Sequence, residues 1–437
     1  MTSFSDRTEV GAIVAAPHPG PGPAFLIYFH IALCCVSLVY VSHFYGEFHI
    51  AFDENHVYQA AAAVALCALI SPFFTLARFS FGYYVGFYLY TAVVGFIWLS
   101  FFTPFNYDQE TARLSAVLSI VALLVPALMI RSPIRQIYVI SERQFERLPI
   151  VILFLTAAII AVGAGYNFRL VGISDIYSFR SDIHQPKTVE YLIGIFSSAL
   201  LPFAFACFVE RRNIWLASVA LAFALLFYPI TLNKLALFLP IWLVAIVLLS
   251  RFFEARTAVV LSIFIPMLIG LILIDAVGLD AIMYFGTVNF RAFAIPASAL
   301  DHYHHFFSTH PLTYFCQVSF MKEVVRCPYS DDLSVVLERA YRLGNFNASL
   351  LATEGIASLG SQLAPISILI CGLILGLANR LSAGLPDRFI LLSGAAFPQI
   401  LLNVPLTTTL LSHGAAFLFL LWYVMPRQKA VPADVSS

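Results

Sequence analysis

Four histidines follow Asp301 in the short stretch from His302 to His310. Asp301 and His305 are four residues apart, so on a helix their side chains share one face. An imidazole with a pKa of about 6.5 suits general base work, and a carboxylate beside it can orient the ring. We therefore expect His305 to be a base oriented by Asp301; the alternative is a set of solvated surface histidines. The spacing matches neither HExxH nor a standard zinc-ligand set, so we expect no metal and no other cofactor.

Arginines in the polar stretches suggest a second kind of chemistry. Arg169, Arg180 and Arg291 each lie between apolar runs, beside aromatic residues. A guanidinium group offers fixed, bidentate donors to phosphate oxygens, so these residues are candidates for binding a diphosphate. The alternative for Arg291 is a side chain that snorkels to the head-group level. Glu354 begins a later apolar run, where the helix dipole favours a carboxylate, and it is the alternative base.

The elements that must position these residues are apolar helices. Hydrophobic residues make up 60% of the 437-residue chain, charged residues only 11%, and the mean hydropathy is +0.87. A soluble domain cannot hide that much apolar surface, so we expect an all-α polytopic membrane protein with about twelve spans of about 20 residues each. A P-loop is absent and the net charge is zero, which argues against an ATP-driven pump and against nucleic acid as a partner. The expected spans are 24–45, 58–77, 82–102, 114–130, 149–165, 190–209, 213–229, 234–250, 257–276, 353–378, 388–403 and 406–425.

The distribution of Lys and Arg predicts the orientation. Short connections on the side of the two termini carry most of the basic residues outside the long loops, which favours cytoplasmic termini. The expected organisation is a cytoplasmic tail at 1–23, a single transmembrane domain at 24–425 and a cytoplasmic tail at 426–437. Two long periplasmic loops, 166–189 and 279–347, interrupt the domain.

The second long loop is expected to contain two amphipathic helices. Apolar residues recur at helical spacing in 297–309 and in 331–343. Such helices would lie on or near the membrane surface and roof a cavity. Cys316 and Cys327 share this loop and could pair in an oxidising compartment, although their spacing alone leaves the question open.

The region that contains these helices also carries a family resemblance. After Asn289 come Arg291 and Pro296, then DHYHHFFSTHPLTYF, then PYS, and finally the small-residue run NASLLATEGIASLGSQLAPISILICGLILGL. Together with many spans and two arginine-bearing loops, this stretch resembles the Wzy-type O-antigen and exopolysaccharide repeat-unit polymerases of the O-antigen polymerase/ligase superfamily. The resemblance covers residues 289–379 and the overall topology.

The resemblance implies a GT-C-like, metal-independent, inverting glycosyltransferase in the bacterial inner membrane. Such an enzyme moves a growing glycan from undecaprenyl diphosphate to a new lipid-linked repeat unit, with Arg180 and Arg291 holding the diphosphates. The implied partners are undecaprenyl-diphosphate-linked glycans and membrane lipid, with a chain-length regulator and a flippase as further candidates.

Two alternatives stay open. One is an O-antigen ligase, because the related ligases use a periplasmic histidine. The other is a lipid or solute transporter or flippase. Transport predicts ionisable residues buried within spans, whereas Glu210, Lys234 and Asp275 all lie at or near the ends of expected spans.

Overall fold

The computed structural model describes residues 22–172, 175–176, 179, 183–318, 321, 324–344 and 346–427. Nearly all of the two expected tails, 1–23 and 426–437, falls outside these residues. Every regular element in the described part is helical. The elements are α1 (Gly22–Phe44), η2 (Gly46–Phe48), η3 (Glu54–His56), α2 (Val57–Ala68), α3 (Pro72–Leu76), α4 (Phe81–Leu99), α5 (Gln109–Met129), α6 (Glu142–Tyr166), α8 (Lys187–Ile195), η4 (Phe196–Leu200), α9 (Leu201–Glu210), α10 (Ile214–Thr231), α11 (Lys234–Phe252), α12 (Ala255–Val277), η5 (Gly278–Ala281), α13 (Ile282–Phe285), η6 (Gly286–Ala294), α14 (Ile295–Thr309), α15 (Leu333–Tyr341), η8 (Leu351–Ala357), α16 (Ser358–Ser382), α17 (Asp387–Ser393), α18 (Phe397–Leu401), α19 (Leu406–Leu411) and α20 (Ala415–Val424).

The chain is an all-α, multi-pass membrane protein. Within the described residues, ten helices are long and apolar enough to cross a membrane. They overlap the first ten of the twelve expected spans, but the ninth, Ala255–Thr309, runs beyond the span expected at 257–276 into residues expected in the second periplasmic loop. Many of their large apolar side chains are exposed, as they must be when lipid rather than water surrounds the bundle.

The last two expected spans are not continuous helices. The span expected at 388–403 is divided into α17 and α18, and the span expected at 406–425 into α19 and α20. Gly394 ends α17, Pro398 stands in the first turn of α18, and Gly414, at φ +76°, precedes α20. Glycine interrupts helices because it has no side chain to restrict its backbone angles. Proline interrupts them because it has no backbone N–H to donate a hydrogen bond.

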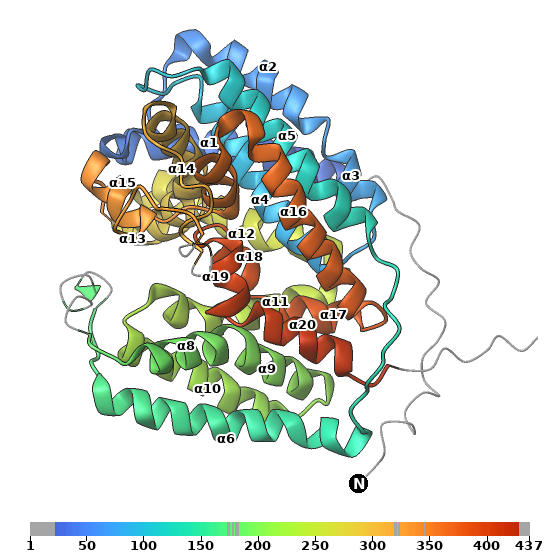
Figure 1. Cartoon of the computed structure of the whole chain (residues 1–437). Helices are drawn as coiled ribbons and strands as arrows, with labels where there is room; N and C mark the ends of the chain where they lie inside the picture. Colours follow the sequence, from blue (N-terminus) through green and yellow to red (C-terminus); the bar gives the residue numbers. More distant parts are fainter. Residues whose placement is uncertain are drawn as a thin grey trace, which may run out of the picture.

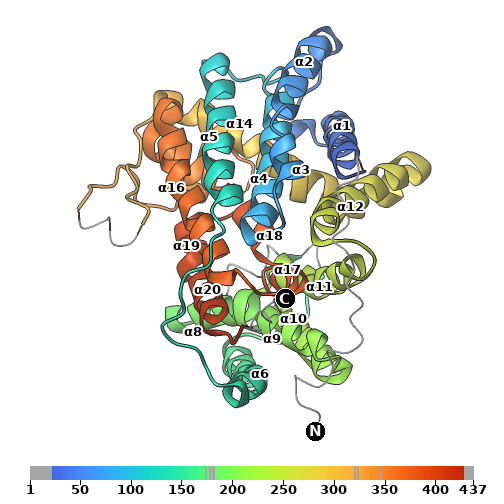
Figure 2. The same cartoon turned by 90° about the vertical axis from the view of Figure 1, so that its right-hand side faces the viewer.

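Helix α4 forms the centre of the bundle, and all of its residues are buried. Figure 2 shows it between α5 and α16 on one side and α1 and α12 on the other. Glycines bring α16 close to α5, since a Cβ atom on Gly372 would lie 2.6 Å from the carbonyl oxygen of Leu123. Small residues allow such close helix packing in membranes. The buried Asn379 adds a polar link, accepting from the Gly82 N–H at 2.7 Å and donating to the Ala127 carbonyl at 2.7 Å.

Both helices predicted in the second long loop form, but only one of them was placed correctly. The helix expected at 331–343 forms as α15. The helix expected at 297–309 forms as α14, but the prediction that it lies on the membrane surface is wrong. Ser298, Asp301, His302 and His304 are buried, with Asp301 only 3% exposed and His302 fully covered, and only the last polar residues of the helix reach solvent. The polar face of α14 packs against other protein elements, because α14 continues α13 and η6 into the bundle beside α4.

Several connections lie together at one end of the bundle. Because successive spans alternate in direction, the described residues of the connections 45–53, 100–108, 167–186, 232–233 and 310–350 share one end, which we call the loop end. In Figure 1, α15 and the connection that follows α6 lie at the same left-hand edge. Helices α6, α8, α9 and α10 form a separate layer in the lower part of that view.

Candidate functional site

The loop end holds a tightly packed group of rings, which we call the histidine cluster: His49, Phe105, His302, His305 and Tyr341. These residues come from four segments: the connection after α1, the connection between α4 and α5, α14 and the end of α15. The ring of Phe105 stacks on His305 with centroids 4.5 Å apart and meets His302 edge-on at 4.8 Å. His302 also meets Tyr341 at 4.8 Å and His49 at 5.5 Å. Aromatic contacts of this kind fix ring orientation.

The protonation of His305 follows from its hydrogen bonds. Its Nδ1 atom lies 2.6 Å from the Tyr341 hydroxyl, which donates to the His302 carbonyl oxygen at 3.3 Å. A phenol has one proton, so both bonds form together only if the His305 Nδ1–H donates to Tyr341. The Nε2 atom then carries a free lone pair. His305 is only partly buried, so this geometry suits a general base that takes a proton from a substrate hydroxyl.

Tyr341 is kept in the neutral form that this arrangement requires. Burial and then the nearby Asp301 carboxylate raise the pKa of the Tyr341 phenol above its usual range. The hydroxyl therefore stays protonated and can donate to the His302 carbonyl while accepting from His305. Sequence reasoning missed Tyr341, because it lies 36 residues from His305 in the chain.

Asp301 does not orient His305, so that prediction is wrong. Its carboxylate accepts a hydrogen bond from the Thr103 hydroxyl at 2.6 Å and another from the Tyr107 hydroxyl. A buried carboxylate needs such donors, and the connection between α4 and α5 supplies them. Burial and then the Asp301 charge raise the pKa of Tyr107, which keeps that phenol protonated. Asp301 therefore anchors α14 to the connection before α5.

Two of the other histidines, His302 and His304, are buried and form hydrogen bonds within the bundle. His302 lies 2.8 Å from the Ser298 carbonyl through Nδ1, and His304 lies 2.7 Å from the Ser361 hydroxyl. Both are buried, so they are not the solvated surface histidines of the alternative interpretation. The Nε2 atom of His304 has no protein partner and borders a void of about 10 Å³ that Ser115 also lines. That volume suits one water molecule. In the part of the chain that the structure describes, no three His, Cys, Asp or Glu side chains are placed to hold a metal ion.

Glu354 lies in the π-helix η8 and connects it to α19. One carboxylate oxygen accepts from the Thr353 hydroxyl at 2.7 Å, and the other accepts from the Thr407 N–H at 3.2 Å and its hydroxyl at 3.3 Å. These three hydrogen bonds and its burial hold the Glu354 carboxylate inside the bundle, whereas His305 is partly exposed. The geometry therefore favours His305 over Glu354 as the base.

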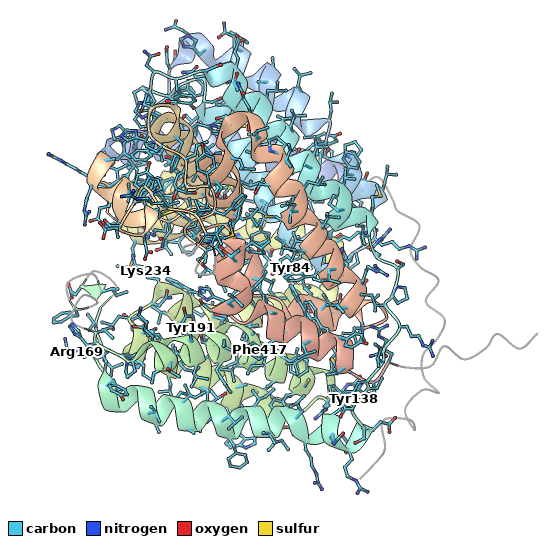
Figure 3. The ribbon with its side chains drawn as sticks, viewed as in Figure 1. Tyr84, Tyr138, Arg169, Tyr191, Lys234 and Phe417 are labelled. Carbon is cyan, nitrogen blue, oxygen red and sulfur yellow. A yellow bond between two sulfur atoms is a disulfide. The ribbon has the colours of Figure 1, made fainter. Side chains whose placement is uncertain are left out.

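The expected arginines do not meet at the histidine cluster. Arg169 is exposed after α6, with its guanidinium 5.8 Å from the Phe179 ring, on the lower layer of the molecule (Figure 3). Arg291 is exposed on η6, and a rise of about 1.5 Å per residue places it about 20 Å from His305 along the helical run. Arg180 lies outside the described residues. Arg113, at the beginning of α5, lies near Tyr107, because its charge lowers the pKa of that phenol, and the Tyr107 ring is 6.3 Å from the His305 ring.

A disulfide joins Cys316 and Cys327, whose Cα atoms are 5.2 Å apart. The chain just before and after Cys316 is bonded to the helix that carries Glu354. Thr313 donates its N–H to the Ala357 carbonyl at 2.8 Å, and the Gln317 amide donates to the Ser358 hydroxyl at 3.0 Å. The disulfide-closed loop therefore packs on η8.

A separate cavity of about 320 Å³ is lined by α8, η4, α10, α11 and the connections beside them, with His413 from the connection between α19 and α20. We call it the α8–α11 cavity. The helices α14 and α15 contribute nothing to its lining, so they do not roof this cavity as expected. Its lining residues are Ile183, Gln185, Glu190, Ile193, Gly194, Ser197, Ser198, Phe227, Thr231, Asn233, Leu235, Ala236, Leu239 and His413.

Sequence reasoning also missed Thr103, Phe105 and Tyr107. The available signal was a short, aromatic-rich connection, FFTPFNYDQE, between two spans at the predicted outer face. Comparison with protein families, with curated proteins and with solved structures finds no match to the chain. The interpretation of the site therefore depends on its geometry and on the pattern of residues.

Proposed function

We propose that the protein is a membrane glycosyltransferase that polymerises undecaprenyl-diphosphate-linked oligosaccharide repeat units at the periplasmic face of the bacterial inner membrane. The observation that carries the proposal is His305, whose Nδ1 is held by Tyr341 and whose Nε2 is free at the loop end. The resemblance of residues 289–379 to repeat-unit polymerases supplies the substrate class.

The proposed reaction is a single inverting displacement. A hydroxyl of the acceptor glycan attacks the anomeric carbon of the donor, and His305 Nε2 takes the hydroxyl proton. The bond between the anomeric carbon and the diphosphate oxygen breaks, and undecaprenyl diphosphate leaves as an anion. Arg291 is about 20 Å from His305 along the helical run and Arg169 lies on the lower layer, so neither contacts the leaving diphosphate at the reacting carbon; we propose them for the diphosphate of the acceptor lipid, which a whole repeat unit separates from the attacking hydroxyl. The donor is already activated, so the step needs no nucleotide and no metal.

The proposed orientation places the loop end in the periplasm and both termini in the cytoplasm. The disulfide between Cys316 and Cys327 supports this orientation, because disulfides persist in an oxidising compartment. The test is cysteine labelling: Ser308→Cys at the loop end should react with an impermeant maleimide added to intact spheroplasts, whereas Ser132→Cys should react only after lysis. The reverse pattern would overturn the orientation.

The function is tested by mass spectrometry of lipid-linked glycans, with a surface-polysaccharide gel, in a strain that lacks the gene. Accumulation of single repeat units without long chains is expected. Long chains stranded on the lipid carrier would identify a ligase instead. An unchanged glycan profile would overturn both enzyme assignments.

Transport is the second candidate, and a specific observation favours it. Asp301 and Glu354 are both buried inside helical runs and contact hydroxyl and amide donors rather than cations. Buried carboxylates in membrane proteins often serve ion coupling. Asp301, however, contacts the connection between α4 and α5, so it lies at the loop end rather than at the centre of a span. The glycan profile separates this candidate from the enzyme.

A further inference from the structure

The α8–α11 cavity has a rim that hydrogen bonds hold in place. The side-chain amide of Asn167 donates to the carbonyl oxygens of Pro229 at 3.1 Å and Ile230 at 3.0 Å. The Arg169 N–H also donates to Pro229 at 2.9 Å, and Gln185 donates to Ile230 at 3.4 Å. These bonds satisfy carbonyl groups at the end of α10, which otherwise lack partners. They fix the connection after α6 against α10, so one wall of the cavity is preformed.

The opposite wall is closed by the connection between α19 and α20. His413 lies in this connection, with its Nδ1 atom 3.4 Å from the Ser198 hydroxyl of η4. The chain passes so close to α8 that a Cβ atom on Gly194 would lie 2.4 Å from the Ser412 carbonyl oxygen. Glycine is therefore required at position 194, and the cavity wall is a close backbone contact rather than a loose loop.

The lining combines neutral polar groups with an apolar surface. Hydroxyl, amide and imidazole groups supply both donors and acceptors, and Glu190 is the only carboxylate among the described residues that line the cavity. Phe227, Leu239 and Ile193 supply the apolar part. Within the part of the lining that the structure describes, no residue is Lys or Arg. A phosphate or diphosphate would meet a carboxylate here without a cation, which is unfavourable.

This chemistry fits a sugar. A sugar ring presents several hydroxyl groups that donate and accept, and it presents C–H faces that pack on apolar side chains. A carboxylate such as Glu190 can accept hydrogen bonds from two hydroxyl groups at once. The volume of about 320 Å³ is at the lower limit for small-ligand pockets, so it suits the end of a glycan rather than a long chain.

We propose that the α8–α11 cavity is a binding site for an uncharged sugar residue at the end of a glycan. The lining residues alone indicate that the ligand is a sugar. The inference rests on the proposed function only in assigning that sugar to a lipid-linked glycan.

The test is a binding measurement on the purified full-length protein in lipid nanodiscs. Saturation-transfer difference NMR is recorded with a panel of neutral hexoses and N-acetylhexosamines, and inorganic diphosphate is the charged competitor. At least one neutral sugar should bind, and diphosphate should not displace it. Absence of binding across the panel, or displacement by diphosphate, would overturn the proposal.

Two variants locate the binding. Ala236→Phe fills the cavity from α11 and should abolish the sugar signal, whereas the matched Ala245→Phe, on the same helix but outside the lining, should keep it. Glu190→Gln removes the charge from an exposed position and should weaken binding about tenfold, as expected for loss of a hydrogen bond to a charged group. If both Ala236→Phe and Glu190→Gln bound the sugar as well as the parent protein does, the sugar would not bind in this cavity.

The binding test and the glycan profile can fail separately. Sugar binding in the cavity with an unchanged glycan profile would retain the sugar site and reject the polymerase. Accumulated single repeat units without sugar binding would retain the enzyme and reject this site.

Discussion

The histidine cluster and the α8–α11 cavity lie at the same end of the bundle, but one is filled by rings and the other is hollow. In the cluster, Phe105 and Tyr341 hold His302 and His305 at centroid distances of 4.5 to 5.9 Å. In the cavity, about 320 Å³ is left open among hydroxyl, amide and apolar groups. A base needs a fixed direction for one lone pair, whereas the end of a glycan needs space. Under the two proposals, proton transfer and sugar recognition therefore take place in different parts of the loop end.

The two regions are connected through α19. Glu354 binds Thr407 near the beginning of α19, and the chain beyond that helix carries His413 into the cavity wall. The helix that contains Glu354 also packs on α14, which carries His305. A change at Glu354 can therefore reach both regions, and the variants below test how far they are independent.

The largest expected effect is the loss of the base in the cluster. His305→Gln should lower the rate of chain extension about 10²- to 10⁴-fold, the usual contribution of a general base, and should leave sugar binding in the cavity unchanged. Chain length on gels and turnover with purified lipid-linked repeat units are the measurements. His310→Gln, an exposed histidine of the same segment, is the control and should retain activity. Normal chain extension in His305→Gln would remove His305 from the reaction.

Asp301→Asn should destabilise the protein rather than change the chemistry directly. The amide keeps one acceptor oxygen, but its NH₂ group faces a hydroxyl donor, so a buried hydrogen bond is lost at a cost of about 1–3 kcal/mol. Thermal unfolding in detergent should show a lower midpoint. Asp331→Asn, at an exposed ion pair with Arg339, should leave the midpoint unchanged. An unchanged midpoint together with lost activity in Asp301→Asn would instead place Asp301 in the reaction.

Tyr341→Phe tests the positioning of His305. The phenyl ring keeps the packing but removes the oxygen that accepts from Nδ1–H, so the proton can move to Nε2. We expect kcat to fall about tenfold, equivalent to one hydrogen bond of about 1.4 kcal/mol, with KM unchanged. The ¹⁵N chemical shifts of His305 should report Nδ1–H in the parent protein and a mixture in the variant. An Nε2–H tautomer in the parent protein would contradict the assignment.

The smallest expected effect is Glu354→Gln, which tests the connection between the two regions. Loss of the charged acceptor for Thr407 should shift α19, and we expect both the extension rate and the sugar affinity to fall about threefold, less than the loss of one charged hydrogen bond. The measurements are turnover and NMR titration on the same preparation. A change in only one of the two would mean that cluster and cavity are independent.

Much of the architecture could be predicted from the residues alone. Apolar runs of about 20 residues located ten spans, because the length of a span depends on membrane thickness and not on its neighbours. The helical spacing in 331–343 identified α15 for a similarly local reason. The division of the last two spans was missed. Their apolar runs are long enough for continuous spans, although Gly394, Pro398 and Gly414 interrupt the helices.

The site depended on tertiary structure. Helical periodicity correctly placed Asp301 and His305 on one helix, but it cannot say which element covers each side chain. Asp301 finds Thr103 and Tyr107 almost 200 positions earlier in the chain, while His305 finds Tyr341 on another helix. The cavity likewise brings together three stretches of the chain, 183–198, 227–239 and His413, of which the last is far from the others in the sequence. Local patterns determine helices because their hydrogen bonds join near neighbours, whereas partners and cavities are decided only when the helices pack.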